Sequence, residues 1–144
     1  MEKQSTALNL LFLPFASLLQ FLDIDAKKLS ILVMLMCIDM VTGTFKAYSI
    51  KENITSRRWI AGFLSKLLVL LVPFTIALMA KGVEFDIKWF IGFSISLMIV
   101  SESYSILGNI YTFRTGEEVA EIDALSYLIK KIREVLENMI EKGK

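Results

Sequence analysis

Charged side chains within or near the ends of long apolar stretches include Asp39, Lys46, Lys66 and Glu102. A carboxylate at the centre of a bilayer costs on the order of 2.5–3.5 kcal/mol on insertion scales, so Asp39 and Glu102 are expected to face a partner or water. Lys46 and Lys66 lie near the predicted cytoplasmic ends of their stretches and can extend to the interface. Three uses remain open for these groups: ion pairs within one monomer, an oligomer interface or permeation path, and a proton relay.

The composition excludes most catalytic chemistry. The 144 residues include no His, which removes His-based triads and His-ligated metal or haem. The single cysteine, Cys37, cannot form an internal disulfide and is predicted to be lipid-facing or packed filler. No basic face with interleaved aromatic residues indicates a nucleic-acid partner. We therefore expect a protein that is not an enzyme and has no cofactor, no metal and no nucleic-acid ligand.

Three long apolar runs dominate the chain, in which 55% of residues are hydrophobic and the mean hydropathy is +0.58. They are Leu29–Ile50, Trp59–Ala80 and Ile87–Ile110, and each has about the 17–25 residues that cross a bilayer as a helix. None shows the alternation of a membrane β-barrel. The predicted fold class is all-α: an integral membrane protein whose residues 29–110 form a three-helix membrane domain.

An apolar segment precedes these runs within residues 1–28. Residues 7–22 carry no charge but include Pro14, and 16 helical residues reach only about 24 Å against a hydrocarbon core of about 30 Å. The segment is either a short tilted span, giving four spans in all, or a helix in the membrane interface.

The charges of the loops predict the orientation. Around the first connection five basic residues face one acid, Glu52, whereas the second connection is balanced. The positive-inside rule places the first loop, and with it the C-terminus, in the cytoplasm. The basic residues of this count are Lys46, Lys51, Arg57, Arg58 and Lys66.

Small and polar residues form stripes at helical spacing on each span. Such stripes permit close helix approach and are predicted to form an intramembrane polar face for oligomerisation. The members are Asp39, Thr42, Gly43 and Lys46 on the first span, Gly62 and Lys66 with Pro73, Ala77 and Ala80 on the second, and Ser101, Glu102 and Ser105 on the third.

Residues 111–144 differ in character and predict a cytoplasmic amphipathic helix from Glu117 to Lys142. Thr115 and Glu118 have the spacing of a capping box that would start it. Seven acids oppose four bases over the helix, which favours a helix partner over an anionic membrane surface. Apolar residues at 3-4-3-4-3 spacing predict a coiled-coil seam: Ile122, Leu125, Ile129, Ile132, Leu136 and Met139.

The order and spacing of several motifs across residues 30–112 resemble the bacteriophage holin family, also called toxin secretion/phage lysis holins. These motifs are Asp39-Met-Val-Thr-Gly-Thr-Phe-Lys-Ala47, then Ser56, Gly62 and Lys66, then Glu102-Ser-Tyr-Ser-Ile-Leu-Gly-Asn109. The apolar segment before Asp23 and the long acidic C-terminal helix depart from the pattern.

The resemblance implies a small multi-pass protein of the bacterial host's cytoplasmic membrane. Such a protein forms homo-oligomers in the bilayer and opens lesions for host cell lysis, or for release of an endolysin or toxin, with an antiholin as a further partner. From the residues alone, an alternative stays open: a non-lytic membrane scaffold, or a small transporter or channel subunit, whose cytoplasmic helix docks a partner.

Overall fold

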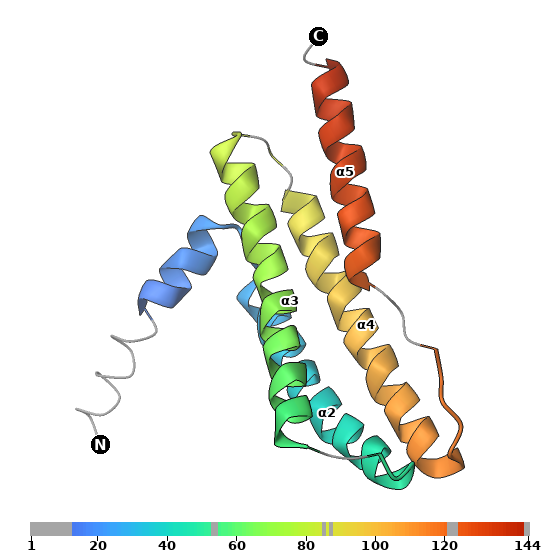
Figure 1. Ribbon diagram of the computed structural model, residues 1–144. Helices are drawn as coiled ribbons and strands as arrows, with labels where there is room; N and C mark the ends of the chain where they lie inside the picture. Colours follow the sequence, from blue (N-terminus) through green and yellow to red (C-terminus); the bar gives the residue numbers. More distant parts are fainter. Residues whose placement is uncertain (1–12, 53–54, 85, 87, 121–123, 143–144) are drawn as a thin grey trace, which may run out of the picture.

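The computed structural model describes residues 13–52, 55–84, 86, 88–120 and 124–142, and the regular structure in these ranges is helical (Figure 1). Four helices follow in order: α2 (Ala26–Ser49), α3 (Ser56–Gly82), α4 (Lys88–Thr115) and α5 (Ala124–Lys142). Residues 13–21 form a shorter helix ahead of them. The all-α prediction is confirmed.

The helices α2, α3 and α4 are each long and apolar enough to cross a membrane. Only 22%, 22% and 33% of their most apolar windows are buried inside the molecule, so most of their side chains face outward, where lipid can cover them. This confirms a multi-pass membrane protein with three candidate spans.

Local sequence signals set the ends of these helices. The Asp25 carboxylate caps α2 by accepting hydrogen bonds from the backbone N–H groups of Lys27 and Lys28, at 2.8 and 3.2 Å. Thr55 caps α3 in the same way. The third span ends at Thr115 rather than at Ile110, because Gly116 is the first residue able to terminate it in a left-handed conformation, with φ of 76°.

The helix α4 packs most extensively on α2, while α3 lies against this pair with fewer contacts. The apolar core lies near one end of the molecule, where Leu32 of α2 and Ile95 of α4 are fully buried. Pro73, Ala77 and Ala80 are buried there too, so the small side of α3 packs as predicted in that half. Gly62, in the other half, has nothing within 4 Å of where its Cβ would lie.

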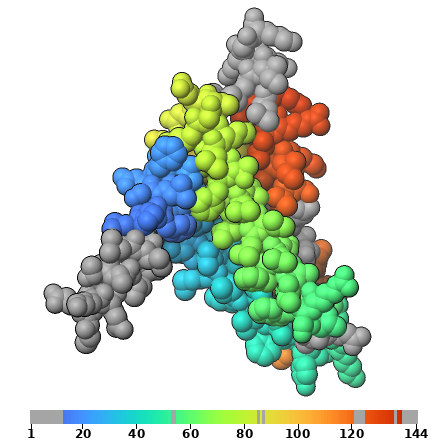
Figure 2. Space-filling model, turned by 60° about the vertical axis from the view of Figure 1, so that its left-hand side comes forward, coloured from blue at the N-terminus to red at the C-terminus, as the bar shows by residue number. Residues whose placement is uncertain are grey.

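The N-terminal helix, residues 13–21, lies against the same half of α3 in both views (Figures 1 and 2). Leu19 and Leu22 join the core, and the chain turns at Asp23 into α2. Nine helical residues rise about 14 Å, less than half of a bilayer core. The rest of the predicted segment, residues 7–12, lies outside the described residues.

The C-terminal helix begins later than predicted. Residues 117–120 are not helical, and the Thr115 hydroxyl instead accepts a hydrogen bond from the N–H of Glu117 at 3.1 Å, so the predicted capping box is wrong. Gly116 ends α4, and residues 117–120 form a linker after it. The acidic residues of this linker contact neighbouring side chains: Glu117 contacts Tyr111 and Glu118 contacts Lys46. The helix α5 then runs beside α4 (Figure 1).

The predicted seam is described only in part. Leu125 and Ile129 are exposed and Ile132 is half-buried, while Leu128, which the seam omits, is fully buried. Ile122 and the side chains of Leu136 and Met139 lie outside the described residues. Pairing between seams of two chains stays a prediction.

Candidate functional site: a charged cluster in the middle of three spans

Three charged residues occupy the middle of three different helices. Asp39 is the fourteenth of 24 residues in α2, Lys66 the eleventh of 27 in α3, and Glu102 the fifteenth of 28 in α4. When the three helices cross a bilayer side by side, these positions fall in its hydrocarbon core.

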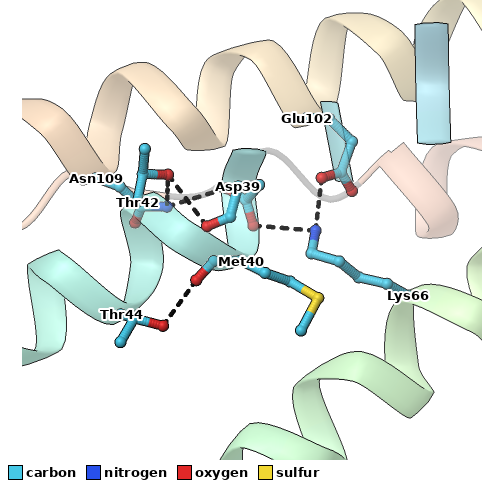
Figure 3. Close-up of polar contacts among 7 residues, drawn as sticks. All are labelled: Asp39, Met40, Thr42, Thr44, Lys66, Glu102 and Asn109. Carbon is cyan, nitrogen blue, oxygen red and sulfur yellow. Dashed lines mark hydrogen bonds and ion pairs between the residues drawn. The ribbon is translucent and has the colours of Figure 1, made fainter. Parts of the chain in front are cut away.

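The Lys66 ammonium lies between the two acids and contacts both directly (Figure 3). Lys66 Nζ lies 3.0 Å from Asp39 Oδ2 and 2.5 Å from Glu102 Oε2. The side chains of Asp39, Glu102 and Lys66 are only 11%, 12% and 21% exposed. Lys66 therefore joins α2 and α4 to α3, and of the uses left open for it, the structure shows ion pairs within one monomer rather than extension to the interface.

A hydrogen-bond network continues from Asp39 toward the end of α4. Asn109 Nδ2 donates to Asp39 Oδ1 at 3.0 Å and to Thr42 Oγ1 at 3.3 Å, while the Thr42 hydroxyl donates to the backbone carbonyl of Asp39 at 3.1 Å (Figure 3). Gly43 lies beside this network, where a Cβ would make ordinary van der Waals contact with Asn109 Nδ2, at 3.6 Å. Asn109 was not among the predicted site residues, although it lies seven residues, or two turns, after Glu102.

A cavity of about 150 Å³ adjoins the cluster on the side of α4. Its wall includes the predicted residues Ser101 and Ser105 together with Glu102 and both lysines, Lys46 and Lys66. The linker after α4 closes one side: Val119 and Ala120 line the cavity, and Glu118 lies 3.6 Å from Lys46 Nζ. The acidic linker thus contacts the polar face of the membrane helices.

A second cavity, of about 190 Å³, lies on the other side of Lys66. Gly43 and Gly62 line it, as do Asp39 and Trp59. The structure therefore places all nine predicted membrane residues in the cluster, in the hydrogen-bond network of Asn109 or on the walls of the two cavities. They are Asp39, Thr42, Gly43, Lys46, Gly62, Lys66, Ser101, Glu102 and Ser105.

The chemistry of this arrangement is ion pairing and hydration. Within the described ranges, no group of three or more His, Cys, Asp or Glu side chains could hold a metal ion. The acids and the lysine can satisfy one another inside one molecule, or exchange that contact for water or for another helix.

Comparison with known families decides the class of this membrane protein. A model of the bacteriophage holin family matches residues 17–142. The chain belongs to the bacteriophage holin family. No curated protein and no solved structure matches it. The match includes the whole charged cluster of this holin and extends through α5, so the acidic C-terminal segment belongs to the matched region. The family is not an enzyme family.

Proposed function

We propose that this holin oligomerises in the bacterial cytoplasmic membrane and permeabilises it, so that an endolysin or a toxin can leave the cell. The observation that carries the proposal is the cluster of Asp39, Lys66 and Glu102 in the middle of three lightly buried spans. A static three-helix protein gains little from charges at this depth, because apolar packing would be as stable or more stable.

Two arrangements of the same helices are available to such a protein. In a single molecule the cluster neutralises most of its own charge, and the outward faces contact lipid. In an assembly the polar walls around Lys66 and Glu102 can line water, and each hydrated charge removes part of the cost of its burial. The open space beside Gly62 supports close approach of a helix from another copy.

The proposed topology follows the loop charges. The connection between α2 and α3, with Lys51, Arg57 and Arg58, lies in the cytoplasm, and the connection between α3 and α4 lies outside. Thiol labelling of single cysteines placed in the two connections tests this orientation. Labelling of the basic connection from outside would contradict it.

The C-terminal helix is proposed to link copies from the cytoplasmic side. The exposed side chains of Leu125 and Ile129 support pairing with a neighbouring chain. For this to happen α5 must leave α4 and uncover Leu128. Substituting Ile129 by Asp should therefore weaken crosslinking between tails and delay permeabilisation without preventing insertion, whereas unchanged crosslinking would contradict the seam.

Controlled expression in a bacterium tests the proposed function. The membrane potential should collapse abruptly after a delay, together with entry of an impermeant dye, because assembly depends cooperatively on concentration. Lys66→Met, expressed to the same membrane level, serves as the matched comparison. Slow growth without dye entry at high membrane levels of the native chain would indicate the alternative, a non-lytic scaffold or small transporter subunit.

A further inference from the structure

The charged cluster contains one more acid than base. Asp39 and Glu102 both contact Lys66, and all three side chains are largely buried in the middle of their helices. With both acids ionised the cluster has a net charge of −1. An excess charge in the core of a bilayer is costly, so a further positive charge or a proton must balance it.

The other basic groups around the cluster already have acidic partners. Lys46 lines the first cavity and lies 3.6 Å from Glu118, and Arg58 lines the second and lies 2.9 Å from Glu52. Tyr104, on the wall of the first cavity, carries a phenol and adds no positive charge. Among the described residues lining the two cavities, no basic side chain is therefore left over to balance the second acid.

The two acids differ in their surroundings. Asp39 uses both carboxylate oxygens: Oδ1 accepts from Asn109 and Oδ2 contacts Lys66. Asp39 therefore has a donor on each of its two carboxylate oxygens. Glu102 contacts Lys66 through Oε2 and lies on the wall of the 150 Å³ cavity, which is large enough for water to reach it.

We propose that Glu102 is a reversible proton-binding site, so that the resting cluster consists of ionised Asp39, protonated Lys66 and neutral Glu102. The cavity beside Glu102 supplies the path by which the proton exchanges with water. Release of the proton converts Glu102 to a carboxylate and leaves the cluster with a charge of −1, which favours hydration. The proton site follows from the geometry of the cluster, while its consequence for permeability rests on the proposed function.

Infrared spectroscopy of the full chain in lipid vesicles tests this site directly. A protonated carboxyl has a C=O stretching band that is distinct from the bands of carboxylates and shifts in D₂O. At neutral pH the native protein should show one such band, which disappears as the pH is raised. Glu102→Gln should abolish it while keeping the size of the side chain. Circular dichroism verifies that each variant retains its helices.

Two further variants make the test independent of Glu102 itself. Asp39→Asn leaves one acid for one base, so Glu102 should ionise and the band should again be lost at neutral pH. Asp23→Asn removes an acid that contacts Lys81 near the end of α3, away from the cluster. This variant should leave the band unchanged. A native protein without the band, or a band that persists in Glu102→Gln, would overturn the proposal.

Dye release from the same vesicles separates the claim of a proton site at Glu102 from the claim that the protein permeabilises membranes. We expect release to increase in the pH range where the band disappears. Vesicles that stay tight at every protein concentration, while the band behaves as expected, would contradict permeabilisation and leave the proton site standing.

Discussion

Two ion clusters connect the helices of this holin, and their compositions are opposite. The cluster at mid-depth has one base between two acids, Asp39 and Glu102. The cluster at the end of the bundle has one acid, Asp23, between Lys81 at 2.7 Å and Lys88 at 3.3 Å. The lysine side chains of the end cluster are 39% and 62% exposed, so water balances its extra charge.

The difference shows how depth decides what an ion pair does. At the exposed end, water and salt screen an ion pair, so it contributes little to stability. In the middle of the spans, removing one partner leaves a largely buried charge without its counter-ion. Asp23 therefore holds the N-terminal segment near α3 and α4, whereas Lys66 joins α3 to the α2–α4 pair.

The largest effect is expected for Lys66→Met. The substitution keeps an unbranched side chain one atom shorter but leaves Asp39 and Glu102 without a base. Removing one partner of a buried pair costs about 3–5 kcal/mol in free energy of unfolding. Unfolding of the purified protein in detergent, followed by circular dichroism, measures this loss. A loss no greater than that of Asp23→Asn would remove the distinction between the two clusters.

A smaller and unequal effect is expected for the two acids. Asp39→Asn removes the charge that Lys66 and Asn109 both contact, and a hydrogen bond to a charged group contributes about 1.5–3 kcal/mol. Glu102→Gln resembles the neutral form of Glu102 and should cost less than Asp39→Asn. The same unfolding measurement compares them at neutral pH. Equal losses would show that the two acids share one charge state.

The smallest effect is expected for Asp23→Asn, and it should depend on pH. The hydrogen bond from Lys81, opposed by partial burial and assisted by Lys88, lowers the pKa of Asp23 below its ordinary value. A lowered pKa in the folded state stabilises the fold at pH values above the ordinary pKa of about 4, and this contribution is lost as the pH falls through the folded value.

Melting curves of the native protein and Asp23→Asn should therefore differ slightly near pH 7 and converge below about pH 4. High salt should also reduce the difference. A difference that grows as the pH falls would contradict this assignment of the Asp23 ion pairs.

The spans and the polar faces could be predicted from the sequence because both depend on local patterns. Continuous apolar length identifies a spanning helix, and the 100° step per residue places Asp39 and Gly43 on one face. The partners across helices could not be predicted in this way. Spacing within α3 left Lys66 free to extend to the interface, and only the packing of α3 beside α2 and α4 places its ammonium between two acids.

The same dependence on tertiary packing explains why the structure of the C-terminal region could not be predicted from the sequence. Thr115 and Glu118 have the spacing of a capping box, but a capping box and a linker after a helix share the same residue types. The contacts of Glu117 with Tyr111 and of Glu118 with Lys46 are tertiary, and they bind these acids to the membrane helices. Burial of Leu128 likewise depends on how α5 lies on α4.

The most direct test of the central claim is the water accessibility of the cluster during permeabilisation. Ser101→Cys places a thiol on the cavity wall beside Glu102, in a chain whose own Cys37 is replaced by Ser. Leu68→Cys, on a side chain of α3 that is 66% exposed, is the lipid-facing control. Both are exposed to a membrane-impermeant thiol reagent before and after dye entry begins.

We expect the Ser101→Cys thiol to react only after dye entry and the Leu68→Cys thiol to stay unreactive throughout, since the cavity wall opens to bulk water, and so to the reagent, when copies assemble. A Ser101→Cys thiol that stays unreactive while dye enters would contradict the account, because the lesion would then form without hydration of the charged cluster.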